Sequence, residues 1–162
     1  MITMRRPLFG AAVALVALSS ADIAVPQQNA PASPLRPVAV AETKLLMEAV
    51  AQPNFEGLEH LFDKKPTELQ AWTFARGQAL LIAEDANLLM LRPPRHGGRE
   101  DWIARSAVLR DRAVALARSA AARDYAACRN GLQALANVCN ACHAKFRVDV
   151  RLTPFAQKPA AP

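Results

Sequence analysis

Tyrosine and glycine are scarce in this sequence, and so are the alternating patterns typical of β-strands. Its 162 residues include one tyrosine and six glycines, and β-branched residues do not alternate with polar ones as they do in half-buried strands. Alanine and leucine are abundant instead, and 52% of the residues are hydrophobic. The length fits a single domain with a buried core, and the composition predicts an all-α protein.

Clusters of basic residues interleaved with aromatic residues are also missing, although Lys and Arg outnumber Asp and Glu by 20 to 14. Nucleic-acid binding usually depends on such a cluster, so no nucleic-acid partner is expected. The mild excess of positive charge favours a contact with an acidic protein instead.

The chain begins with an apolar run over residues 8–18 that is too short to span a bilayer, which takes about 20 residues. Two arginines precede this run and small residues follow it, a pattern typical of a secretory signal. We therefore predict a signal peptide over residues 1–21, export to the periplasm, and no stable membrane insertion after cleavage. A retained N-terminal anchor is the alternative.

Four prolines within residues 22–37 predict a disordered linker after the signal. Apolar residues then recur at helical spacing over residues 38–152, which predicts one helical domain. Four helices joined by short connections indicate an antiparallel four-helix bundle. Residues 153–162, which are rich in proline and alanine, are predicted to form a disordered tail.

The predicted helices have identifiable ends. The first helix starts near Val38 and stops or kinks at Pro53, where Asn54 can cap a restart. The second runs from a Thr67–Gln70 capping box to about residue 91, and the third covers residues 99–121. The fourth follows Asp124, a good N-cap residue, and fades by residue 152.

Cys139, Cys142 and His143 form a Cys-x-x-Cys-His motif on the fourth predicted helix. At about 100° per residue, Cys142 lies about 60° from Cys139 and His143 about 40° from it on the other side, so all three leave one face. This motif is typical of covalent haem c attachment, in which the two thiols form thioethers and the histidine binds the iron.

Zinc binding and thiol redox chemistry are the alternatives for this motif. A structural zinc site needs four ligands, and only Cys128, His60 and His96 could complete it. A thioredoxin-type pair starts a helix beside a strand, and no strand is predicted. Haem c is attached outside the bacterial cytoplasm, which agrees with the predicted export. We therefore favour haem attachment over both alternatives. Cys128 is expected to be buried, and an intermolecular disulfide is the minor alternative.

Only 19 residues follow His143, and none is methionine. This C-terminal placement, the Cys-x-x-Cys-His-x-x-Phe-Arg sequence of residues 139–147 and the four helices resemble class II c-type cytochromes, the cytochrome c′ family. Trp102 adds weaker support, and the similarity covers roughly residues 38–152. It implies one covalent haem c on Cys139 and Cys142, with His143 as the proximal ligand, redox partner proteins, and homodimers pairing through the first two helices.

Arg147 follows His143 by one helical turn. On the same helix face it could tune the imidazole or meet a haem propionate, and a solvated arginine is the equal alternative. Lys145, Arg147 and Arg151 are candidate contacts for a redox partner.

The sixth iron position is faced by a residue of the first helix in the family that this chain resembles. Met47 occupies a suitable place there, although core methionines are common; Met90 and His60 are the other candidates. Ligation by Met47 implies single-electron transfer without enzymatic turnover. If Met47 does not reach the iron, the resemblance implies a five-coordinate haem that binds nitric oxide or carbon monoxide.

Overall fold

The computed structural model describes residues 37–96 and 98–156. These residues belong to the second of two units into which the chain divides, residues 36–162. The predicted signal peptide (residues 1–21) lies outside the described residues, as do nearly all of the predicted linker and the last part of the predicted tail.

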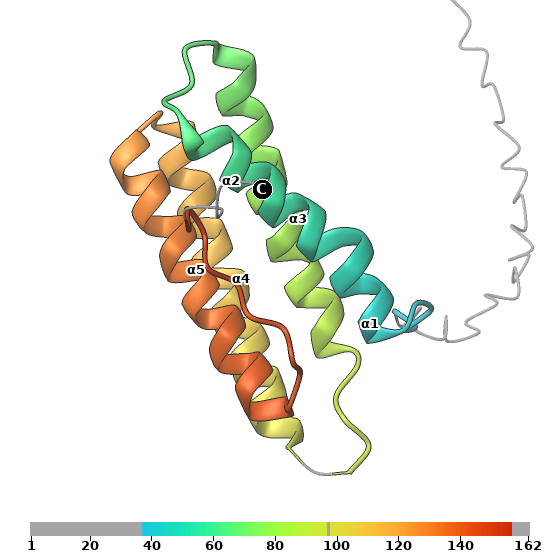
Figure 1. Cartoon of the computed structure of the whole chain (residues 1–162). Coiled ribbons are helices and arrows are strands. Elements are labelled where there is room, and N and C mark those ends of the chain that lie inside the picture. The colour runs from blue at the N-terminus through green and yellow to red at the C-terminus, as the bar shows by residue number, and fades with distance from the viewer. Residues whose placement is uncertain (1–36, 97, 157–162) are drawn as a thin grey trace, which may run out of the picture. The chain divides into compact units, whose positions relative to one another are not determined.

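The described residues form four helical runs and no strand, which confirms the all-α prediction (Figure 1). The first run is continuous and has a π-helical middle. The elements are α1 (Thr43–Leu46), the π-helix η1 (Met47–Ala51), α2 (Gln52–Asp63), α3 (Leu69–Met90), α4 (Arg99–Ala121) and α5 (Tyr125–Phe146).

The first helical run, which was predicted to stop or kink at Pro53, does not stop there. Proline lacks an amide hydrogen, and its ring crowds the carbonyl four residues earlier. The chain widens into η1 just before Pro53, where the Gln52 amide donates to the Met47 carbonyl, and such π turns relieve helical strain. Asn54 does not cap a restart: its Nδ2 donates to the Val50 carbonyl oxygen at 2.7 Å. The run also begins at Thr43 rather than near residue 38.

The starts of the later helices agree with the sequence to different degrees. The predicted start of the third helix is confirmed at Arg99. At the fourth, Asp124 accepts a hydrogen bond from the Ala127 amide at 2.9 Å, which confirms the predicted N-cap. The predicted capping box before α3 does not form, because Glu68 is the N-cap residue and makes no side-chain cap hydrogen bond.

The hydrophobic core receives side chains from all of the long helices. α3 packs on α4, α4 on α5, and α2 on both α3 and α5, whereas η1 packs on α2 and α3. Fully enclosed side chains include Leu58, Phe62, Leu116, Leu132 and Leu135. Among the described residues, no helix is long and apolar enough to cross a membrane.

α5 ends at Phe146, six residues before its predicted end. Arg147 adopts a left-handed conformation with φ of 58°, and the Val148 amide bonds to the His143 carbonyl oxygen at 2.9 Å. Residues 148–156, here called the C-terminal strap, then turn back beside α5 (Figure 1). Phe155 packs against the hydrophobic core. The predicted disorder is therefore wrong for residues 153–156.

Candidate functional site

The Cys-x-x-Cys-His motif lies in the last turns of α5. The buried face of this helix carries Leu132, Leu135 and Ala136, and it continues to Cys139, which is half-buried and packs against the core. Cys142 and His143 are also half-buried. The helix therefore presents the three motif residues at the edge of the core.

Both motif thiols are free and are held in their protonated form. Burial, followed by the neighbouring Cys142, raises the pKa of Cys139 to about 12. Burial also raises the pKa of Cys142, against the opposing effect of Arg105. Redox-active cysteines depend on a lowered thiol pKa, so these surroundings do not favour a thiol redox pair.

Cys128 lies away from solvent, as expected from the sequence. Its side chain is fully buried in the core, and this burial raises the pKa of its thiol to about 11. Within residues 37–96 and 98–156, no group of three or more His, Cys, Asp and Glu side chains could hold a metal ion. A structural zinc site would need four such ligands, and the described residues do not assemble them.

His143 makes one hydrogen bond that defines its chemistry. Its Nδ1 lies 2.9 Å from the carbonyl oxygen of Val150, in the C-terminal strap. A carbonyl oxygen can only accept, so Nδ1 carries the hydrogen. In a neutral imidazole with this tautomer, the lone pair belongs to Nε2, which is then free to bind a metal. Histidines that ligate metals usually donate their other ring N–H to a carbonyl or carboxylate in this way.

The strap is fastened to α5 by a reciprocal pair of hydrogen bonds. Asn140 donates from Nδ2 to the Leu152 carbonyl oxygen at 2.8 Å, and the Leu152 amide donates to Asn140 Oδ1 at 2.8 Å. Farther along, the Phe155 amide donates to Glu59 Oε1 of α2 at 2.7 Å. The guanidinium of Arg129 lies 3.6 Å from the centroid of the Phe155 ring, a cation–π contact.

Aromatic packing joins α3, α4 and α5 near the motif. The Trp102 indole donates to the Leu89 carbonyl oxygen at 2.6 Å, and its ring meets Phe146 edge-on with centroids 4.9 Å apart. Lys145, a predicted partner contact, is paired with Asp101 at 2.6 Å. This ion pair lowers the pKa of the Asp101 carboxyl.

Arg105 lies near the motif, although the scattered arginines of its helix predicted no binding role from sequence. It extends from α4, and its Nη1 donates to the Ala141 carbonyl oxygen at 3.3 Å. Its Nε is buried without a hydrogen-bond partner. Such an unsatisfied donor calls for an explanation. Its position three residues after Trp102 was the available signal, because residues at that spacing share a helix face.

The three candidates for a sixth iron ligand lie in different places. Met47 begins η1, is half-buried and packs against the core that Cys139 also contacts. Met90 is the last residue of α3 and is half-buried. His60 is exposed on α2, and His96, a further zinc-ligand candidate, is exposed before α4. No described contact joins any of these residues directly to His143.

Arg147 does not extend the helical face of His143, contrary to the prediction. α5 ends one residue earlier, and the left-handed conformation of Arg147 redirects the chain. The side chain is exposed. The sequence-based reason for giving Arg147 a role at the imidazole therefore no longer holds, and a contact with a propionate stays a prediction.

Comparison with known proteins leaves the site to be judged on its own geometry: no family model, curated protein or solved structure matches this chain.

Proposed function

We propose that this protein is a periplasmic, monohaem c-type cytochrome of class II that transfers single electrons and has no enzymatic activity. The observation that carries the proposal is the hydrogen bond from His143 Nδ1 to the Val150 carbonyl oxygen. It leaves Nε2 as the metal-binding nitrogen, next to the free thiol of Cys142, the preceding residue, and one turn from that of Cys139.

The proposed haem attachment uses two free thiols and a buried arginine nitrogen that lacks a hydrogen-bond partner. Each thiol would add across one vinyl group, the sulfur bonding to carbon and the hydrogen going to the neighbouring carbon. The buried Nε of Arg105 lacks a partner, and a haem propionate would satisfy it. When bound, the haem iron supplies a one-electron redox couple.

We also propose that the four helical runs alternate in direction, as in an antiparallel bundle with the haem on α5. Two contacts support this arrangement. Trp102, near the start of α4, bonds to the Leu89 carbonyl oxygen near the end of α3. Tyr125, at the start of α5, bonds to the Phe62 carbonyl oxygen near the end of α2 at 3.1 Å.

Met47 is the sixth ligand in this proposal. Its thioether would favour the reduced iron and fill the last coordination position, which leaves no open site for substrate. Met47 packs against the same core as Cys139. Arg151 and Arg147 are exposed near the motif and suit docking to an acidic redox protein; Lys145 is partly engaged by Asp101.

A five-coordinate haem that binds nitric oxide or carbon monoxide is the second candidate. The observation that favours it is that η1, apart from its continuation into α2, packs on α3, while α5 packs on α4 and α2. Met47 therefore sits on an element that packs separately from the motif helix.

An optical spectrum of full-length protein matured with a haem-attachment system tests both candidates. Haem that stays with the chain after denaturation supports covalent attachment. A far-red methionine–iron charge-transfer band in the ferric form, with poor carbon monoxide binding, supports electron transfer. A high-spin spectrum with ready carbon monoxide binding supports the second candidate. Haem that is released on denaturation contradicts both.

A further inference from the structure

The C-terminal strap (residues 148–156) provides the hydrogen-bond acceptor for His143, although it lies outside the motif and outside any helix. The contact uses a backbone carbonyl, that of Val150. A backbone acceptor cannot be removed by changing its own side chain, so its position depends on what holds the strap. Two residues after Val150, the backbone of Leu152 is hydrogen-bonded to a side chain of α5.

Asn140 anchors Leu152 with both ends of its amide. The two bonds, each 2.8 Å long, satisfy the Leu152 carbonyl and amide together. Asn140 and His143 are three residues apart on α5, and residues at this spacing are neighbours on a helix surface. The anchor and the imidazole therefore meet the strap side by side, at residues 152 and 150.

We propose that Asn140 is a positioning residue that sets the tautomer and orientation of His143 by fixing the strap. With Leu152 held by Asn140, the Val150 carbonyl keeps the hydrogen on Nδ1 and leaves Nε2 bare. For the iron this inference rests on the proposed haem function. For the imidazole it does not, because that part of the inference uses only the contacts of His143, Val150, Asn140 and Leu152.

The expected consequence in the haem-loaded protein is a shift of the reduction potential. An imidazole that donates a hydrogen bond from Nδ1 is a more basic ligand and favours the oxidised iron. Replacing Asn140 with Ala loosens the strap and weakens that bond. The potential of Asn140→Ala should therefore rise relative to the unchanged protein.

The direct test is nitrogen NMR of the His143 ring in full-length protein without haem, at a pH of about 8.5, where imidazoles are neutral. The expected result is an Nδ1–H tautomer in the unchanged protein and a mixture containing Nε2–H in Asn140→Ala. His60 and His96, which are exposed, serve as internal references. Hydrogen exchange of the Leu152 amide reports whether the strap has loosened.

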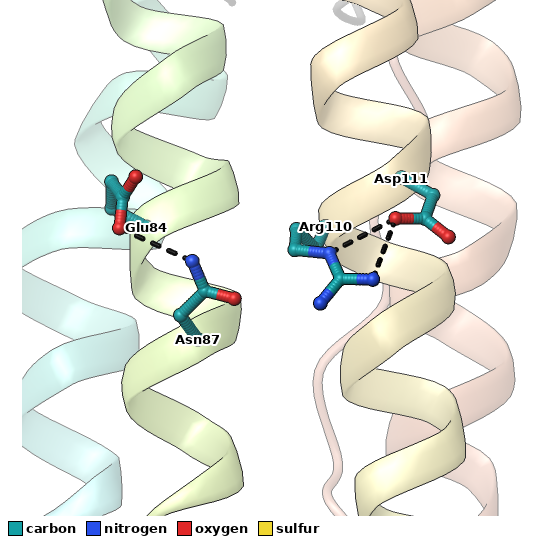
Figure 2. Close-up of polar contacts among 4 residues, drawn as sticks. All are labelled: Glu84, Asn87, Arg110 and Asp111. Atoms are coloured by element: carbon teal, nitrogen blue, oxygen red, sulfur yellow. Dashed lines mark hydrogen bonds and ion pairs between the residues drawn. The ribbon is translucent and has the colours of Figure 1, made fainter.

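Asn87→Ala is the matched control, because it also removes an asparagine side-chain hydrogen bond. Asn87 Nδ2 bonds Glu84 Oε2 at 3.2 Å within α3, away from the strap (Figure 2). It should leave the His143 tautomer unchanged. Asn140→Asp keeps the acceptor for the Leu152 amide and loses the donor, so an intermediate tautomer population is expected. If Asn140→Ala fails to fold, the Asn140→Asp variant is used for the test instead.

Two results would overturn the proposal. One is an Nε2–H tautomer of His143 in the unchanged protein. The other is an unchanged Nδ1–H tautomer in Asn140→Ala while exchange of the Leu152 amide speeds up. Because these readouts need no haem, they are independent of the proposed function. A protein that binds no haem but shows the tautomer shift would support the positioning role of Asn140 and contradict the proposed cytochrome function.

Discussion

The two candidate iron ligands belong to regions that are fixed in different ways. His143 lies in the α4–α5 region (α4, α5 and the C-terminal strap), where a carbonyl holds its ring and Asn140 holds the strap. Met47 lies in the α1–α3 region (α1, η1, α2 and α3), at the start of a π-helix. Of the four buried side-chain atoms without a partner among the described residues, three belong to α3 (Gln78 Oε1, Asp85 Oδ1 and Asp85 Oδ2).

The surroundings of His143 are therefore arranged in advance by hydrogen bonds, whereas those of Met47 are not. On the His143 side, the hydrogen bonds that a ligating imidazole needs already exist. On the Met47 side, the π turn and the unsatisfied groups of α3 mark a region whose local energetics are less favourable. The proposed role of His143 therefore rests on a hydrogen bond that the structure contains, whereas the proposed distal residue must be found by substitution.

The largest expected effect is the loss of the distal ligand in Met47→Ala. If Met47 binds the iron, nearly all of the ferric iron should become high-spin, and the methionine–iron band should disappear, while the haem stays covalently attached. The ferric optical spectrum and carbon monoxide titration measure this change. Carbon monoxide should bind at least about tenfold more tightly, or ~1.4 kcal/mol, because no internal ligand has to be displaced.

Met90→Ala provides the matched control, since Met90 is also half-buried in the α1–α3 region. Its spectrum should be unchanged. The opposite pattern, in which Met90→Ala loses the band and Met47→Ala keeps it, would move the distal ligand from η1 to the end of α3.

The next effect concerns the buried carboxyl of Asp85, the most enclosed unsatisfied group of the α1–α3 region. Burial raises its pKa from 3.8 to about 6 in the folded protein, although Arg92 opposes the shift. The folded state therefore holds this proton more tightly than the unfolded state. The contribution of Asp85 to the free energy of unfolding is therefore highest below a pH of about 4, falls as the pH rises to about 6, and is then level.

Asp85→Asn should remove this loss and raise the free energy of unfolding at pH 7 by up to about 3 kcal/mol. Urea unfolding between pH 4 and 8 measures it. Asp111→Asn is the control, because Asp111 is exposed and pairs with Arg110 on the surface of α4 (Figure 2). Parallel pH profiles for Asp85→Asn and the unchanged protein would contradict the assignment.

The sequence predicted the α4–α5 region better than the α1–α3 region, for reasons that individual residues make clear. The start of α4 at Arg99 and the cap at Asp124 depend on local chemistry, which a sequence pattern records. Pro53 was predicted to stop or kink the first helix because its local effect is unfavourable. A five-residue π turn absorbs that effect, and packing of η1 on α3 decides between the two outcomes.

The motif residues were found from sequence, but their hydrogen-bond partners were not. Val150 and Leu152 take part through backbone groups, and any residue type supplies those. Their contact with α5 depends on the chain reversal at Arg147, a left-handed conformation that arginine rarely adopts. Non-local contacts such as Phe155 with Glu59 also hold the strap, and no local sequence pattern predicts such contacts.

The smallest expected effect compares two helix starts that look alike in sequence. Asp124 accepts a cap hydrogen bond from Ala127, so Asp124→Ala should lower the free energy of unfolding by about 1 kcal/mol. Thr67 precedes α3, where no side-chain cap forms, so Thr67→Ala should change it by less than about 0.5 kcal/mol. Urea unfolding of both variants under one condition gives the two values. Equal losses would mean that the Thr67 capping box forms in solution, and the two regions would then not differ at their helix starts.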